Sequence, residues 1–145
     1  MKKLNMCKSS INTAQYGKED ASFIAAGGMN GLRKLVDDFY HHMSTLPVSK
    51  KIFEMHTGEI EIVKDKLTLF LCGWLGGELV YRPKYGRIII PLAHGHLEIG
   101  PDERDAWMYC MMQAVADQSQ WPACFKKYFL DQIYVPAERT RNQED

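Results

Sequence analysis

The sequence lacks the features of a membrane protein and of a secreted one. Its 145 residues contain no apolar run approaching the roughly 18 residues that a membrane-spanning helix needs. The basic start, residues 1–8, is not followed by the apolar segment of a signal peptide. We therefore expect a soluble, cytoplasmic protein without a membrane partner.

An excess of charge of one sign is also absent, because 18 Lys and Arg residues balance 18 Asp and Glu residues. A protein that binds nucleic acid normally carries a basic surface, so the composition does not favour a nucleic-acid partner. The length suits one domain with a core of its own. We expect a mobile N-terminal extension over residues 1–18, a folded domain over residues 19–136 and a polar tail over residues 137–145.

Cysteines are few, and none of the four forms a C-x-x-C pair. Cys72, Cys110 and Cys124 lie in apolar helical patterns, whereas Cys7 lies near the start. We interpret all four as buried free thiols in a reducing compartment. A cysteine hydrolase is a rival hypothesis, but no cysteine lies in the electropositive surroundings that activate a thiol.

Apolar residues that recur every three or four positions predict an all-α fold. The expected helices cover residues 20–26, 29–43, 59–75, 102–116 and 122–135, with a tight helical turn over 48–53. Gly27-Gly28 and Gly76-Gly77 suit helix ends, and Pro136 is expected to end the last helix. Residues 87–90 alone look like a strand, but no second strand could pair with it. We therefore expect residues 78–93 to be an ordered loop leading into a short turn of helix.

The stretch from Pro91 to Trp107 is the most informative part of the sequence. It delivers two histidines, His94 and His96, and then turns at Gly100-Pro101 into an acidic helix start. A histidine just before that helix and the indole of Trp107 inside it can face one cavity. This arrangement is typical of a metal ligand on one side of a bound group and a hydrogen-bond donor on the other.

Aromatic and apolar residues elsewhere are expected to line the same cavity. The helix over residues 29–43 turns Phe39 and Tyr40 inward, and the helix over residues 59–75 turns Leu67 and Phe70 inward. Each residue alone is more typical of packing than of function. Together with His94 and Trp107 they line a large, flat, apolar cavity that holds one ring nitrogen and two donors. Haem binds in such surroundings.

At these residues the chain resembles the truncated haemoglobins, specifically group II of that family, over most of its length from about Gly28 to Val135. The matching segments are Leu35-Val36-Asp37-Asp38-Phe39-Tyr40, then Leu67-Thr68-Leu69-Phe70-Leu71 leading to Gly76-Gly77, and Glu103-Arg104-Asp105-Ala106-Trp107. The resemblance implies a two-over-two helical sandwich around a haem b whose iron is bound by His94. It also implies haem-pocket roles for eight residues: Phe39, Tyr40, Phe53, Val63, Lys66, Leu67, Phe70 and Trp107.

Within that set, Tyr40 and Trp107 look like the distal hydrogen-bond donors, and Phe53 looks like the residue that stacks on the porphyrin. Leu67 and Phe70 look like its apolar wall. Val63 looks like the residue at the distal gate, and Lys66 could reach a propionate.

The chain departs from the family around the iron ligand. Ala93 stands where the family usually has an arginine directly before the histidine, so Lys66, Lys84 or Arg87 would have to substitute for that cation. His96 follows closely and is a rival ligand, although the spacing to Trp107 favours His94. These changes also motivate an alternative, a haem-free globin fold that acts as a partner-binding or sensor module.

The expected function is binding of oxygen and other diatomic ligands with slow release, for redox or nitric-oxide chemistry. Two donors in a dry pocket would slow ligand release, which suits chemistry or sensing better than delivery. Any enzymatic activity would depend on the haem, as an oxygen, nitric-oxide or peroxidase-type reaction. An unidentified reductase is then an expected partner, and the expected oligomeric state is a monomer or a weak homodimer.

Overall fold

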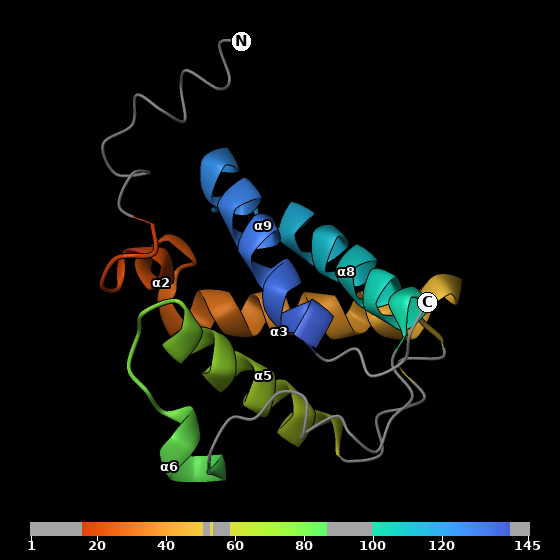
Figure 1. Cartoon of the computed structure of the whole chain (residues 1–145), viewed down its shortest axis with the longest axis horizontal. Helices are drawn as coiled ribbons and strands as arrows, with labels where there is room; N and C mark the ends of the chain where they lie inside the picture. The colour runs from red at the N-terminus through yellow and green to blue at the C-terminus, as the bar shows by residue number, and fades with distance from the viewer. Residues whose placement is uncertain (1–15, 51–52, 54–58, 87–99, 140–145) are drawn as a thin grey trace, which may run out of the picture.

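The computed structural model describes residues 16–50, 53, 59–86 and 100–139, and for residues 136–139 it describes only the backbone. Every regular element in this part of the chain is helical, as the sequence predicts. The elements are α2 (Ala21–Ala25), α3 (Gly28–Thr45), the 3-10 turn η2 (Pro47–Ser49), α5 (Ile60–Trp74), α6 (Tyr81–Tyr85), α8 (Pro101–Ala116) and α9 (Ala123–Arg139) (Figure 1). None of these helices is long and apolar enough to cross a membrane.

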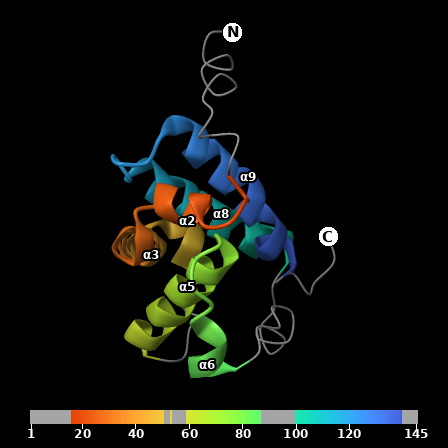
Figure 2. The same ribbon diagram turned by 90° about the vertical axis from the view of Figure 1, so that its left-hand side faces the viewer.

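The long helices form two layers of two, the expected two-over-two sandwich. Helix α3 crosses the middle of the molecule, with α5 packed on one side of it and α8 on the other (Figure 1). Helix α9 lies along α8, and α6 lies against α5, an arrangement that the turned view in Figure 2 also shows. Helix α3 is therefore the element that joins the two layers.

Helix α3 has the apolar face that its periodicity predicts. Its buried residues recur at steps of three and four, and they are Leu32, Leu35, Val36, Phe39, Tyr40 and Met43. The helix ends when Leu46 turns to an extended conformation directly before Pro47, because a residue before proline avoids the α conformation. The observed limits extend the predicted 29–43 by one residue at the start and two at the end.

Helix α5 carries two apolar stripes that are buried to different degrees. Thr68, Leu71 and Cys72 are buried where α5 packs on α3. A second stripe, spaced by four, three and four residues, is only partly buried and consists of Val63, Leu67, Phe70 and Trp74. Leu71 follows Leu67 by one turn and so lies between the two stripes, and it is fully buried. The division leaves an incompletely covered apolar surface along α5.

Helix α8 begins as its sequence predicts, one residue before the expected Asp102. Pro101 occupies the first position, and Asp102 and Glu103 supply negative charge in the first turn. The Gly100 amide donates a hydrogen bond of 2.7 Å to Glu103 Oε1. This cap fixes the start of the helix on which Trp107 is carried.

The end of α9 contradicts the prediction that Pro136 ends the last helix. The helix continues through Pro136 to Arg139. A proline loses its own N–H bond and its ring crowds the carbonyl four residues earlier, but the residues after it can still keep helical dihedral angles. Helix α6 occupies Tyr81–Tyr85, where a loop is expected, and residues 87–93, which lead to the expected short turn of helix, lie outside the described part.

The Gly76-Gly77 pair does more than end α5, which is all that the sequence predicts for it. A Cβ atom on Gly76 would lie 1.7 Å from the carbonyl oxygen of Glu19, and Gly76 has a φ of +94°. The Phe23 amide also donates to the Leu75 carbonyl at 3.1 Å. The residues around α2 therefore run directly over this turn, and only a glycine leaves room for that approach.

We predict that Gly76→Ala strongly destabilises the protein, by about 2–4 kcal/mol, because it combines a left-handed backbone with a clash against main chain. Gly86→Ala is the matched control, since Gly86 has a φ of +86° but no atom within 4 Å of its added Cβ. Gly86 has a ψ of −163°, an extended region that is essentially restricted to glycine, so the control measures backbone strain alone, about 1–3 kcal/mol. Urea unfolding of both variants measures the difference, and equal losses would contradict the clash.

Candidate functional site

Three aromatic side chains from two helices meet at the centre of the molecule. The ring of Phe39 on α3 lies 4.9 Å from that of Tyr40 and 5.0 Å from that of Trp107 on α8, both in edge contacts. Phe39 is fully buried and Tyr40 is 6% exposed. The structure thus places the two predicted hydrogen-bond donors against one buried ring, although 67 positions separate them in the sequence.

Burial keeps the Tyr40 phenol neutral. It raises the pKa of Tyr40 far above its ordinary value of 10.0. A neutral phenol has a hydroxyl hydrogen to donate, whereas a phenolate can only accept. Tyr40 is therefore held in the protonation state that the predicted role requires.

The tryptophans differ in how their indole N–H groups are used. Trp121 Nε1 donates to the Ala26 carbonyl at 3.0 Å, a contact between distant parts of the chain. Within the described residues, Trp107 Nε1 donates to no protein group. An indole nitrogen can only donate, so no described residue competes for the hydrogen of Trp107.

The partly buried stripe of α5 forms the apolar side of the site. Val63, Leu67 and Phe70 pack against the core but stay partly exposed, and so does Phe53. Leucine and phenylalanine are usually buried, so a whole stripe left incompletely covered is a surface that another apolar group can cover. A flat and mostly apolar group such as haem fits this requirement.

A charged cluster lies beside this stripe. Lys84 Nζ lies 2.7 Å from Asp65 Oδ2, so the charge of Lys84 is already compensated. Lys66 is exposed and makes no ion pair with any described residue, and its Nζ lies 5.2 Å from the centre of the Tyr85 ring. Of the two described cations considered for the role missing at Ala93, Lys84 is thus paired with Asp65 and Lys66 is not, while Arg87 lies outside the described residues. Sequence reasoning did not single out Asp65 or Tyr85, since their contacts join residues about 20 positions apart.

The predicted iron ligand is not tested by the structure. His94, its rival His96, Ala93 and Arg87 all lie outside the described residues. Among the residues that are described, no group of three or more His, Cys, Asp or Glu side chains could hold a metal ion. The assignment of His94 therefore stays a prediction.

The cysteines give no support to a thiol-based enzyme. Cys72 and Cys110 are free and buried, as predicted, and burial raises the pKa of both thiols. A raised pKa disfavours the thiolate that a nucleophile needs. Cys124 is disulfide-bonded, which contradicts the predicted free thiol there, and Cys7 lies outside the described residues.

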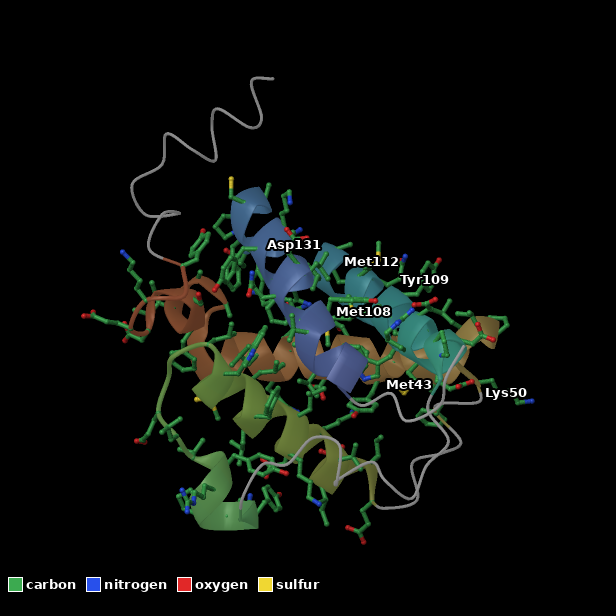
Figure 3. The ribbon with its side chains drawn as sticks, viewed as in Figure 1. Met43, Lys50, Met108, Tyr109, Met112 and Asp131 are labelled. Atoms are coloured by element: carbon green, nitrogen blue, oxygen red, sulfur yellow. The ribbon has the colours of Figure 1, made fainter. Side chains whose placement is uncertain are left out.

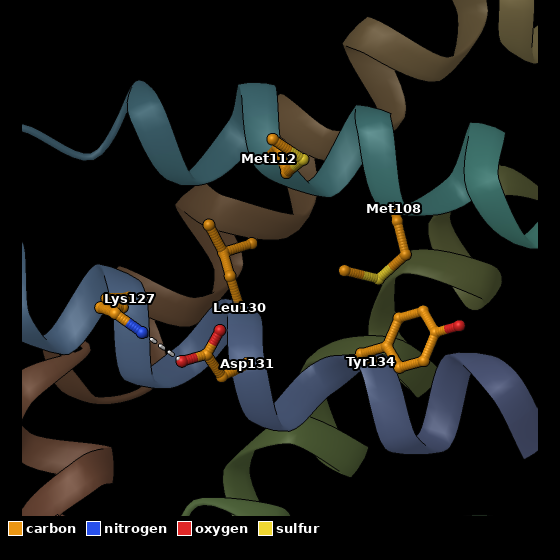
Figure 4. A pocket seen from close by; sticks show the side chains of 6 residues that line it. All are labelled: Met108, Met112, Lys127, Leu130, Asp131 and Tyr134. Atoms are coloured by element: carbon orange, nitrogen blue, oxygen red, sulfur yellow. Dashed lines mark hydrogen bonds and ion pairs between the residues drawn. The ribbon is translucent and has the colours of Figure 1, made fainter.

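A separate surface groove runs between α8 and α9. Figure 3 shows Met108 and Met112 on α8 and Asp131 on α9, and Figure 4 shows the groove from close by. Its lining residues are Met108, Met112, Lys127, Leu130, Asp131 and Tyr134. None of the predicted site residues contributes to it, so the candidate site remains the aromatic cluster and the stripe of α5.

Comparison with known proteins agrees with this architecture. The sequence model of the bacterial-like globin family matches residues 22–133. The group 2 truncated haemoglobin YjbI of Bacillus subtilis strain 168 is 27% identical over 114 residues, which cover 79% of this chain and 83% of that protein.

Solved structures of similar fold include a group II two-on-two haemoglobin from Agrobacterium tumefaciens, with a TM-score of 0.78 and 28% identity over 86% of this chain and 95% of that one. A cold-adapted truncated haemoglobin from Pseudoalteromonas haloplanktis TAC125 has a TM-score of 0.79 and 26% identity over 84% of this chain and 98% of that one. The family match covers well over half of the sequence, and membership of this family implies binding of haem and of a ligand. The chain belongs to the bacterial-like globin family, and its relatives include group II truncated haemoglobins.

Proposed function

We propose that the protein is a cytoplasmic haem b globin that binds oxygen and other diatomic ligands and releases them slowly. One observation carries this proposal: Tyr40 and Trp107, two hydrogen-bond donors, border the same buried Phe39 ring. A globin that served only as an apolar container would not need two donors at this position. The arrangement supports a pocket that is built to hold a polar ligand.

The chain's own residues divide the task of holding the haem. When bound, the haem supplies the iron at which diatomic ligands bind, and His94 is its proposed protein ligand. Phe39, Phe53, Val63, Leu67 and Phe70 would contact the porphyrin through apolar surface, and Lys66 would steady a propionate. This last contact is weak, because exposed ion pairs contribute only about 0–1 kcal/mol.

The donors control how long a ligand stays. Bound oxygen carries partial negative charge, and a hydrogen bond to a charged acceptor stabilises it by about 1.5–3 kcal/mol. Val63 at the proposed gate has no polar hydrogen, so this stabilisation falls to Tyr40 and Trp107. Slow release suits redox or nitric-oxide chemistry, with an unidentified reductase as partner, better than it suits oxygen delivery.

A haem-free module that binds a partner protein is the second candidate. The absence of a cation at Ala93, directly before the proposed ligand, is the feature that favours it. The absorption spectrum of the purified protein separates the two, since only a haem protein shows an intense Soret band that shifts with carbon monoxide.

We predict that His94→Ala abolishes stable haem binding, because it removes the proposed bond to iron. His96→Ala is the matched control, two positions away, and should retain haem. Haem retention on a desalting column and the ferrous spectrum of each variant measure the effect. If loss of His96 empties the pocket while loss of His94 does not, the ligand assignment is wrong.

We predict that Tyr40→Phe and Trp107→Phe each raise the oxygen dissociation rate by roughly ten- to a hundredfold, because each removes one donor worth about 1.5–3 kcal/mol. The two effects should not add in the double variant, since both donors address one ligand. Stopped-flow release of oxygen and of carbon monoxide measures both. Bound carbon monoxide is a poorer hydrogen-bond acceptor, so its dissociation rate should change much less. If both dissociation rates rise by the same factor, the two residues act on the ligand only through their size.

The buried phenol also predicts how stability depends on pH. The pKa of Tyr40 in the folded protein is raised above the ordinary 10.0, so its contribution to stability is complete below pH 10 and is lost as the pH rises. The free energy of unfolding should fall above pH 10, with Tyr40 contributing about 1.4 kcal/mol per pH unit. Tyr40→Phe should flatten this slope by that amount in urea unfolding of the haem-free protein. If the free energy of unfolding falls with pH at the same slope in both proteins, the Tyr40 phenol is not buried from water as described.

A further inference from the structure

Helix α6 has little of its own to hold it in place. It has five residues, no buried side chain and no side-chain cap at its N-terminus. A helix of this length is not stable by itself, because the cost of fixing its first turn exceeds the gain of its few hydrogen bonds. Contacts to a neighbouring element must therefore decide where α6 lies, and that neighbour is α5.

Asp65 on α5 supplies such a contact twice. Lys84 Nζ donates to Asp65 Oδ2 at 2.7 Å, and the Tyr85 hydroxyl donates to the same oxygen at 2.6 Å. Hydrogen bonds to a carboxylate are shorter and stronger than those between neutral groups. The Asp65 side chain is 29% exposed, so water competes only in part. The two bonds hold the pKa of Asp65 below its ordinary value, which keeps the carboxylate charged.

The contact of Asp65 with Lys84 and Tyr85 also positions Lys66, the cation proposed to bind a haem propionate. Lys66 Nζ lies 5.2 Å and Lys84 Nζ 5.4 Å from the centre of the Tyr85 ring, which is within the range of cation–π attraction. Asp65 compensates the charge of Lys84 and fixes the ring that Lys66 approaches. Lys66 alone of this group keeps an uncompensated charge within the described residues.

We propose that Asp65 is a positioning residue that holds α6 on α5 and so prepares the haem site from outside it. Through Tyr85 it orients Lys66. Through α6 it also sets the position of Gly86, the residue after the helix, which precedes His94 by eight residues. The part that concerns haem rests on the proposed function, whereas the attachment of α6 to α5 does not.

The test compares Asp65→Asn with Asp65→Glu and with the control Asp131→Asn. Asparagine keeps the shape but loses the charge, and glutamate restores the charge. The control removes an ion pair of similar length, Lys127 to Asp131 at 2.8 Å, on a different helix. The first readout is amide exchange of Gly86, whose N–H donates to the Arg82 carbonyl at 2.9 Å and reports on α6. It is measured by nuclear magnetic resonance on the haem-free protein.

We expect Asp65→Asn to speed Gly86 exchange roughly tenfold, which corresponds to losing the stronger of the two bonds. Asp65→Glu should recover most of the protection, and Asp131→Asn should match the wild type. The second readout is haem loss from the loaded protein to a scavenging apoglobin. Asp65→Asn and Lys66→Ala should each speed it a few-fold, and the double variant should add little to either.

Unchanged Gly86 exchange in Asp65→Asn would overturn the proposal, whatever the haem-loss rate. Faster exchange with wild-type haem loss would overturn the link to the haem site. If the wild-type protein takes up no haem, the proposed function fails, and Gly86 exchange still decides whether Asp65 holds α6.

Discussion

Burial of α3 on both sides is the constraint on which the rest of this structure depends. Helix α5 covers one side and α8 the other, and Leu32, Leu35, Phe39 and Met43 are fully buried between them. Burial of each such side chain is worth about 1.5–3 kcal/mol, so neither layer can leave α3 without exposing a large apolar area. Because Phe39 and Tyr40 lie on this helix, the two layers that enclose α3 also enclose the candidate site.

The candidate site arises where this enclosure is incomplete. One stripe of α5 packs against α3, and the other, which includes Val63, Leu67 and Phe70, stays partly exposed. An apolar surface of this kind costs free energy in water, and a flat apolar group that covers it would recover that cost. The proposed haem therefore completes a packing that the helices alone leave open, while Tyr40 and Trp107 provide the polar contacts that packing does not supply.

Much of the fold follows from local patterns. The spacing of Leu32, Leu35, Val36 and Phe39 predicts α3 and its buried face, and the Gly100-Pro101 turn with its acidic residues predicts the start of α8. That Tyr40 and Trp107 share one site was predicted from the combination of residues and from the resemblance to group II truncated haemoglobins, and in the structure both rings lie against Phe39. No local period could have placed them together.

What the sequence by itself determined is which residues form helices and which of them share a face, because both depend on residues within one or two turns of each other. The tertiary structure alone decided what covers each face. It buried Leu71 fully while leaving Leu67, one turn earlier on nearly the same side of α5, partly exposed, and it placed the Glu19 carbonyl where only a glycine at position 76 leaves room. It also gave Asp65 its partners on α6. These contacts join segments that are distant in sequence, and they form only once the helices have packed.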